Sequence, residues 1–148
     1  MKIITENKKA YHDYDIKNRM EAGIRLLGSE VKSVREGRVK ISGSHVKFSQ
    51  GKILVLGLRI GAYPKAFDRK KIDPMRSREL LLNKREISKL VGLDSQKGWA
   101  LLPLKMYIKN NLIKLEIGAG RFLKKQDKRE KLKRRDSDRR TRRILRSN

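Results

Sequence analysis

The most informative absence from this sequence is cysteine, of which its 148 residues contain none. Without thiols the chain has no disulfide, no cysteine nucleophile and no cysteine-based zinc site. Histidine is almost as scarce, because His12 and His45 are the only two and neither has a second metal ligand at a useful spacing. We therefore expect no metal ion and no cofactor, and the lack of thiols suits a reducing compartment.

Long apolar runs and a signal sequence are also missing. The longest apolar runs, ILVLGL (53–58) and WALLPL (99–104), are far shorter than the roughly 20 residues that cross a bilayer as a helix. Residues 1–15 contain no apolar stretch of the kind found in signal peptides. The sequence predicts a soluble, cytoplasmic protein without a membrane partner, and a monomer is the default expectation.

Recognisable catalytic patterns are absent as well. There is no GxxxxGK[ST] phosphate loop, and the glycines of EAGIRLLGSE and REG lie too far apart for a dinucleotide fingerprint. The sequence YHDYD offers one candidate base, His12, with Asp13 or Asp15 to orient it, which leaves a small ribonuclease as one alternative. The other interpretation is that these polar groups face a partner or solvent. We interpret the chain as a binding protein and not as an enzyme.

What the sequence has in abundance is positive charge. Lysine and arginine number 40 against 16 acids, a net charge of +24. Residues 124–148 hold 13 of these bases and four of the acids, so that both this tail (+9) and the rest of the chain (+15) are basic. A charge of this size needs a polyanionic partner, and its spread over body and tail favours nucleic acid on an extended surface.

The residue types also indicate how nucleic acid would be bound. Aromatic residues make up only 5% of the chain, so we expect recognition of RNA shape and backbone more than base stacking. Phe48 and Tyr107 fit core positions, while Tyr11, Tyr14 and Tyr63 are candidates for exposure. The candidate phosphate-binding cations of the body are Lys8, Lys9, Lys32, Arg35, Arg69, Lys70, Lys71, Arg76, Arg78, Lys105 and Lys109.

Short strands and turns alternate through the first 123 residues. Hydrophobic residues make up 37% of the chain, enough for one modest core. A small, mainly antiparallel barrel with flanking helices fits this pattern, because closure removes exposed strand edges. Residues 1–10 are expected to be irregular and 59–79 to form a long functional connection. The predicted elements are a strand over 11–27, a helix over 29–37 that Ser29 caps and Gly37 ends, a hairpin over 44–58, a helix capped by Asn83 with Glu86 completing a capping box, and a hairpin over 99–120.

Five stretches, taken in order and with their spacing, resemble one family. NKKAYHDYDI, EAGI, GSEVKSVREGRV, DPMRSRELLLNKREI and DKREKLKRRD are similar to the SsrA-binding protein family, also called small protein B, the bacterial partner of transfer-messenger RNA. The resemblance implies an oligonucleotide-binding-type antiparallel barrel over residues 1–123. It also implies binding to the tRNA-like domain of transfer-messenger RNA, and delivery of that RNA to stalled ribosomes for trans-translation, without catalysis by the protein itself.

The resemblance also implies which residues of the body contact RNA. Glu21 stands out among them, since an acid must accept a hydrogen bond from a ribose hydroxyl or base amino group, hold a cation, or form an ordinary surface ion pair. For Leu81 the alternative is a core position. The implied RNA contacts are Asn7, Lys8, Tyr14, Glu21, Lys32, Arg35, Leu81 and Lys114.

For residues 124–148 the resemblance implies a tail that becomes helical in the messenger channel and decoding centre of the ribosome. Four acids are followed four residues later by a base, a spacing that supports a helix by about 0.2–0.5 kcal/mol per pair. With few apolar residues to dock it, the tail is expected to be disordered when free. Its implied ribosome contacts are Asp127, Lys128, Arg129, Lys133, Arg135, Ile144 and Leu145.

Two features depart from the family pattern. Gln126 stands where relatives often carry an aromatic residue or histidine, and Phe122 and Leu123 replace a Gly-Lys-rich approach to the tail. Phe122 is interpreted either as a stacking surface or as a cap on the core. A different RNA-binding module, such as a ribosomal protein or an RNA chaperone, remains the alternative that composition alone allows.

Overall fold

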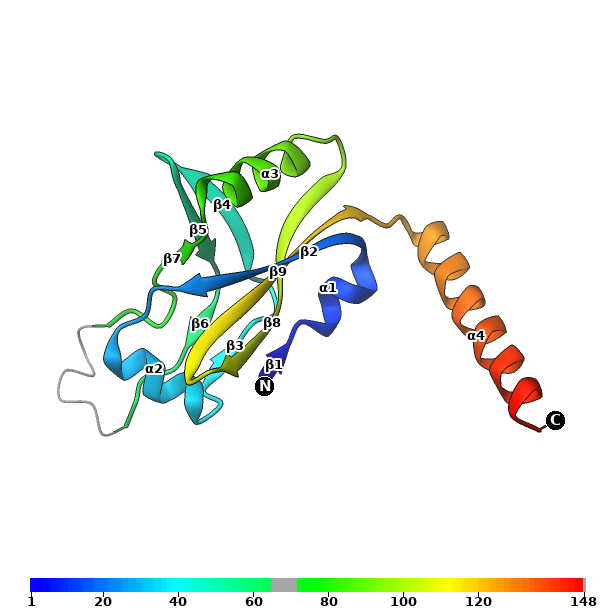
Figure 1. The fold of residues 1–148 in the computed structure, drawn as a ribbon, viewed down its shortest axis with the longest axis horizontal. Coiled ribbons are helices and arrows are strands. Elements are labelled where there is room, and N and C mark those ends of the chain that lie inside the picture. Colours follow the sequence, from blue (N-terminus) through cyan, green and yellow to red (C-terminus); the bar gives the residue numbers. More distant parts are fainter. Residues whose placement is uncertain (65–71, 148) are drawn as a thin grey trace.

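The fold is a strongly curved antiparallel sheet flanked by three helices, with a fourth helix projecting from it (Figure 1). The computed structural model describes residues 1–64 and 72–147, with side chains up to residue 140. The elements are β1 (Lys2–Glu6), α1 (Lys8–Asp13), β2 (Tyr14–Ile24), α2 (Gly28–Arg35), β3 (Val39–Lys40), β4 (His45–Ser49), β5 (Lys52–Leu56), β6 (Arg59–Ile60), β7 (Arg78–Leu81), α3 (Lys84–Asp94), β8 (Trp99–Lys109), β9 (Leu112–Phe122) and α4 (Lys125–Ser147).

Seven strands form the main sheet, in the order β1-β8-β9-β2-β7-β5-β4, and β3 pairs with β6 separately. The sheet curls until β4 contacts β8, although the hydrogen-bonded order ends at β1 and β4. The predicted mainly β fold with flanking helices is confirmed. Among the described residues no ladder of hydrogen bonds joins its two edges, so the sheet is curled but not closed.

The main core fills the concave side of this sheet. Alternate residues of the long strands point into it, among them Ile24, Val55, Met106, Leu115 and Ile117, all buried. Full burial of such a side chain contributes about 1.5–3 kcal/mol. Phe48 packs against this core, as predicted, and Leu90 of α3 covers one of its ends.

A smaller apolar cluster lies on the opposite face of the sheet, where α1 packs against β2 and β8. Ala10 of α1 is buried there with Leu102 and Leu104. Beneath this cluster β9 carries glycine, which lets its neighbours β2 and β8 come close. A Cβ on Gly118 would lie 2.6 Å from Leu104 Cδ1, and one on Gly120 would lie 2.5 Å from the carbonyl oxygen of Asp15. The face of the sheet opposite the main core is called here the outer face. Helix α1 covers one half of this face and leaves the other half open.

Both predicted hairpins are confirmed. Their turn residues explain why the hairpins could be predicted from the sequence. Gln50 and Gly51 connect β4 to β5 with positive φ angles of 50° and 75°. Asn110 and Asn111 do the same between β8 and β9, at 51° and 62°. Glycine and asparagine are the residues that tolerate this backbone geometry, which matches the twist of paired strands.

The N-terminal expectations were wrong. Residues 1–10 are not irregular, because β1 pairs with β8 and α1 follows it. The strand predicted over 11–27 begins only at Tyr14, since α1 extends through Asp13. The prediction that Ser29 caps α2 was also wrong. Leu27 occupies the N-cap position and its amide donates to Glu30 Oε1 at 2.9 Å. The capping box of Asn83 and Glu86 is confirmed, at 2.8 and 3.1 Å.

Candidate nucleic-acid interface

A row of residues crosses the open half of the outer face, the side of the sheet opposite the main core. The register pairs Gly23 of β2 with both Leu81 of β7 and Lys114 of β9, and pairs Lys114 with Tyr107 of β8. Leu81 is 47% exposed, so the core alternative for this residue was wrong. A Cβ on Gly23 would lie 3.2 Å from Leu81 Cβ, which shows how closely the row is packed. Two of the implied RNA contacts, Leu81 and Lys114, thus flank one glycine.

Glu21 lies on the same face, two residues before Gly23. Lys109 Nζ lies 3.3 Å from Glu21 Oε2, so the structure contains the surface ion pair that sequence reasoning allowed. A hydrogen bond from Tyr107 lowers the pKa of Glu21 below its ordinary range, and Lys109 lowers it further. Burial raises the pKa of Tyr107, so it stays a neutral donor. Glu21 is therefore an ionised acceptor on a partly exposed surface, able to accept from a ribose hydroxyl or base amino group.

The cations of α2 lie at the same end of the sheet as this row. Arg35 donates from Nη2 to the carbonyl oxygen of Asn111 at 3.1 Å, which holds the helix against the β8–β9 turn. Lys32, one turn earlier, lies with its Nζ 5.6 Å from the centre of the Tyr63 ring. Both α2 side chains are exposed. The residues that the resemblance implies at this end of the sheet are called here the α2 surface: Glu21, Lys32, Arg35, Leu81 and Lys114.

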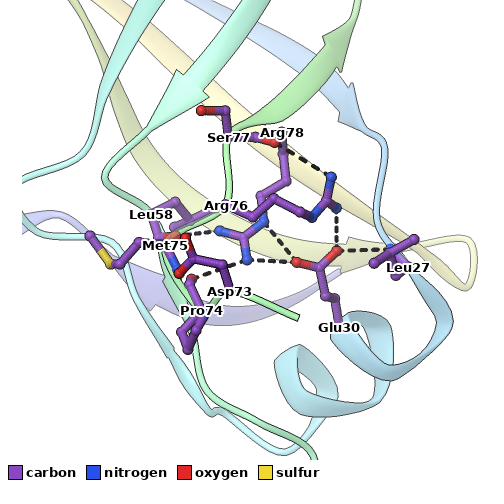
Figure 2. Close-up of polar contacts among 9 residues, drawn as sticks. All are labelled: Leu27, Glu30, Leu58, Asp73, Pro74, Met75, Arg76, Ser77 and Arg78. Carbon is purple, nitrogen blue, oxygen red and sulfur yellow. Dashed lines mark hydrogen bonds and ion pairs between the residues drawn. The ribbon is translucent and has the colours of Figure 1, made fainter. Parts of the chain in front are cut away.

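A buried ionic cluster fixes α2 to β7 beneath this surface (Figure 2). Glu30 Oε2 accepts from Arg78 Nε at 2.9 Å and from Arg78 Nη2 at 2.6 Å, and Glu30 Oε1 accepts from Arg76 Nη2 at 2.5 Å. Arg78 also donates to the carbonyl oxygens of Leu58 and Pro74. Burial alone would raise the pKa of Glu30, but the bonds from Arg76, the Leu27 amide and Arg78 outweigh it and lower the pKa.

This cluster corrects one of the predicted phosphate contacts. Arg78 is 0% exposed and fully engaged inside the protein, so its assignment as a surface cation was wrong. Arg76 is partly buried and also bonded to Glu30. Arg69, Lys70 and Lys71 lie outside the described residues. A run of basic letters therefore contains both structural and exposed side chains, and only tertiary contacts separate them.

The remaining implied RNA contacts of the body lie around α1. Asn7 is 3% exposed and caps this helix, because its Oδ1 accepts from the Ala10 amide at 3.2 Å and its Nδ2 donates to the Pro103 carbonyl at 2.8 Å. Its side chain is thus occupied in holding α1 on the sheet. Lys8, the next residue, is exposed, and Tyr14 is half-buried with its ring edge-to-face against Phe122 at 5.4 Å.

The tail begins beside α1 and continues as one helix, α4. Lys128 Nζ lies 2.8 Å from Asp13 Oδ1, and this hydrogen bond is the main cause of the lowered pKa of Asp13. Asp127 lies 3.9 Å from Arg121. Of the four acid–base pairs predicted within the tail, Glu130–Arg134 is formed, at 3.9 Å. Arg129, Lys133 and Arg135 are exposed, and the side chains of Ile144 and Leu145 lie outside the described part.

The implied contacts thus fall into two groups at opposite ends of one strand. Tyr14 and the start of α4 lie at the beginning of β2, and the α2 surface lies at its end. An 11-residue strand rises about 3.3 Å per residue, so roughly 35 Å separates its ends. The structure therefore places these contacts on two surfaces at opposite ends of the sheet, with the exposed Lys17 and Arg19 of β2 between them.

His12, the candidate base of the ribonuclease alternative, contacts Asp13. His12 Nδ1 lies 3.0 Å from Asp13 Oδ1, but the same carboxylate oxygen is bonded to Lys128. Among the described residues no group of three or more His, Asp or Glu side chains is placed to bind a metal ion. Within the same residues, no helix combines the length and the apolar character needed to cross a bilayer.

Comparison with known proteins decides between the RNA-binding families that this geometry allows. A family model described as SmpB protein matches residues 4–147. The chain belongs to the SmpB protein family. Within it, the chain is 45% identical to the SsrA-binding protein of Geobacillus kaustophilus (strain HTA426) over 145 residues, which cover 98% of this chain and 93% of that protein.

Further SmpB comparisons agree. The SsrA-binding protein of Oceanobacillus iheyensis is 50% identical over 143 residues, covering 93% of this chain and 92% of that one. The SsrA-binding protein of Bacillus subtilis (strain 168) is 43% identical, covering 98% and 92%. A solved structure described as "tmRNA-SmpB: a journey to the center of the bacterial ribosome" is similar with a TM-score of 0.68 and 40% identity, covering 85% of this chain and 92% of that chain. The resemblance inferred from the five motifs is confirmed.

Sequence reasoning missed the residues that act through backbone atoms or through burial. Glu30 was read only as part of a helix, and no local signal pairs it with arginines 46 and 48 residues away. The carbonyl oxygens of Tyr11 and Tyr14, which accept from Lys131 at 2.9 and 3.2 Å, have no signature in the sequence at all.

Proposed function

We propose that this protein binds the tRNA-like domain of transfer-messenger RNA and delivers it to stalled ribosomes for trans-translation. The observation that carries this proposal is family membership over nearly the full chain, with relatives named SsrA-binding proteins and a similar solved structure that combines tmRNA, SmpB and the ribosome. The net charge of +24 supports a polyanionic partner.

The two basic surfaces divide this work. The α2 surface binds the tRNA-like domain, with Lys32, Arg35 and Lys114 on phosphates, Glu21 accepting from a sugar or base, and Leu81 in apolar contact. Lys8 and Tyr14 extend the contact around α1, where Asn7 acts by holding the helix in place. Residues 1–123 form the RNA-binding unit, and 124–148 form the ribosome-binding tail.

The protein acts by binding and not by catalysis, in the bacterial cytoplasm, as a monomer and without a cofactor. On the ribosome the tail enters the messenger channel and decoding centre, where ribosomal RNA neutralises its charge. Its exposed bases contact phosphates there, and its helix is fully stabilised only in that setting. The proposed tail contacts are Asp127, Arg129, Lys133, Arg135, Ile144 and Leu145, whereas Lys128 is bonded to Asp13 within the protein.

The deciding experiment is to purify the protein from bacterial cells at low salt and sequence the RNA that copurifies. Strong enrichment of transfer-messenger RNA supports the proposal. Ribosomal RNA without transfer-messenger RNA would favour a ribosomal protein or RNA chaperone instead. Incubation of labelled RNA with wild type and His12→Ala tests the ribonuclease alternative, which requires cleavage that the substitution abolishes.

A pair of matched double variants tests the α2 surface. Lys32→Ala/Arg35→Ala removes two exposed cations beside the row, and Lys47→Ala/Lys52→Ala removes two exposed cations on the β4–β5 hairpin, so both lower the net charge equally. We expect the first to weaken binding of the tRNA-like domain by about 10–100-fold and to reduce its salt dependence by about two phosphate contacts. Equal losses for both variants would contradict a defined surface.

A further inference from the structure

We propose that Asp13, Lys128 and Lys131 are positioning residues that dock the first two turns of α4 onto the end of α1 and so fix the direction of the tail. Lys128 then acts through Asp13 and not through ribosomal RNA. The inference deepens the proposed function, because a tail of fixed direction matters only if the tail has a destination. The docking itself is a property of the free protein.

The chain is already anchored where it leaves the sheet. The amide of Leu123 donates to the carbonyl oxygen of Asp13 at 2.9 Å, and the amide of Phe122 donates to the carbonyl oxygen of Gly98 at 3.0 Å. Leu123 is buried, so the two residues that depart from the Gly-Lys-rich family pattern tie the junction down. Phe122 packs its ring against Tyr14.

The first turn of α4 then receives its own cap. Asp127 Oδ2 accepts from the Lys124 amide at 3.3 Å and faces Arg121 of β9 at 3.9 Å. A carboxylate at this position accepts from an amide that has no partner within the helix, and its negative charge is stabilised by the positive end of the helix dipole. The helix therefore begins at a defined residue next to the sheet.

Two lysines make the docking contact itself. Lys128 and Lys131 are three residues apart, so they lie on one face of α4. Lys128 Nζ lies 2.8 Å from Asp13 Oδ1 and 5.7 Å from the centre of the Phe122 ring. Lys131 Nζ donates to the carbonyl oxygens of Tyr11 and Tyr14, at 2.9 and 3.2 Å.

These carbonyl groups explain why lysine suits the position. They lie at the C-terminal end of α1, where helix carbonyl groups have no partner within the helix and carry partial negative charge. Lys131 supplies a cation there, and Asp13 supplies a full negative charge to Lys128. Both lysines and Asp13 are largely shielded from solvent, in contrast with Lys133, Arg134 and the following residues to 140, which are exposed. The docked part of the tail ends near Lys131.

The lack of cysteine allows a clean test of the free protein. Spin labels on Ser49→Cys at the end of β4 and Leu132→Cys at the end of the docked turns of α4 report the distance between body and tail, with all other residues wild type. We expect a narrow distance distribution in the wild type. Either single substitution, Asp13→Lys or Lys128→Asp, should broaden the distribution about twofold or more. The double variant should restore the narrow distribution, because the two residues are coupled through one contact. Arg129→Asp, on an exposed neighbour, is the control and leaves the distribution narrow.

Tagging on stalled ribosomes gives the second readout. The docking model predicts that each single charge reversal reduces tagging about tenfold and that the charge-swapped pair recovers to within about threefold of wild type. A broad wild-type distribution, or a narrow one with Lys128→Asp, would overturn the docking. Loss of tagging that the swap fails to rescue, with the distance restored, would place Lys128 on ribosomal RNA. Binding of the tRNA-like domain, measured in parallel, tests the proposed function separately, and unfolding curves check that each variant folds.

Discussion

At the scale of single residues, the glycines of β9 decide how closely the chain can pack. Gly120 lies under β2, where a Cβ would meet the carbonyl oxygen of Asp15 at 2.5 Å and its carbon at 3.0 Å. Both are backbone atoms of a paired strand, so neither can move without disturbing the ladder. The glycine is required for space, and its φ angle is not in the left-handed region.

We therefore expect Gly120→Ala to lower the free energy of unfolding by about 1–3 kcal/mol, the usual cost of overpacking. Gly92 in α3 is the control, because nothing lies within 4 Å of an added Cβ and its backbone is helical. Gly92→Ala should raise stability by up to about 1 kcal/mol through helix propensity. Urea unfolding of both variants measures the contrast, and equal effects would contradict the steric explanation.

Glu30 illustrates how a charged residue becomes structural. It is 3% exposed and faces two arginines. Glu30→Gln should cost about 3–5 kcal/mol, because the Arg78 guanidinium would stay buried without its counter-charge. The matched control is Glu36→Gln in the exposed pair with Arg38, expected to cost less than about 1 kcal/mol.

The pH dependence of this difference follows from the lowered pKa of Glu30. A depressed folded-state pKa contributes stability that is present above the ordinary value of 4.5 and is lost as the pH falls through the folded value. The stability gap between wild type and Glu30→Gln should thus be constant near neutral pH and shrink only below 4.5. A gap that narrows between pH 6 and 8 would point to another group.

At the scale of elements, the clearest sequence signals were those with a local physical cause. Both hairpins and α3 were predicted, because turn glycine and asparagine residues and the Asn83–Glu86 capping box act within a few residues. The elements that were missed include β1 and α1, which depend on distant partners, and β6 and β7, which lie in or overlap the predicted connection over 59–79. β1 is ordered by pairing with β8, and α1 by packing on Leu102 and Leu104.

Two asparagine caps allow this difference to be measured. Asn7 and Asn83 each accept from an amide three residues later, but Asn7 is buried and also donates to the Pro103 carbonyl across the sheet. Asn83→Ala should cost about 1 kcal/mol, whereas Asn7→Ala should cost at least about 1 kcal/mol more, because a buried carbonyl group loses its donor.

Hydrogen exchange should locate the effects of the two substitutions. Asn7→Ala is expected to speed amide exchange in α1, and Asn83→Ala in α3 only. If the two substitutions lower the free energy of unfolding equally, the hydrogen bond from Asn7 to the Pro103 carbonyl adds no stability beyond that of the helix cap.

At the scale of the whole molecule, charge is distributed over two surfaces that one long strand holds apart. The α2 surface and the tail junction lie at opposite ends of β2. Binding of one RNA region should therefore leave the other surface accessible. This arrangement suits a protein that binds transfer-messenger RNA and the ribosome at the same time.

Removal of residues 132–148 tests this separation, because it retains the docked turns of α4. We expect the affinity for the tRNA-like domain to change by less than about threefold at 150 mM salt, since the loss of distant charge is largely screened beyond about 8 Å. Tagging on stalled ribosomes should be lost. A large drop in RNA affinity on truncation would show that the tail is part of the primary RNA site.

The family, the basic character, the two hairpins and the capped helix could be predicted from the amino-acid sequence, because they depend on composition and on contacts between near neighbours. Which polar and charged side chains are exposed depends on the tertiary fold. It buried Arg78 against Glu30, committed Asn7 to α1, exposed Leu81 and drew Lys128 and Lys131 onto the end of α1. Burial and pairing of a charged side chain depend on what the fold places beside it, and those partners lie 20 to 120 residues away along the chain.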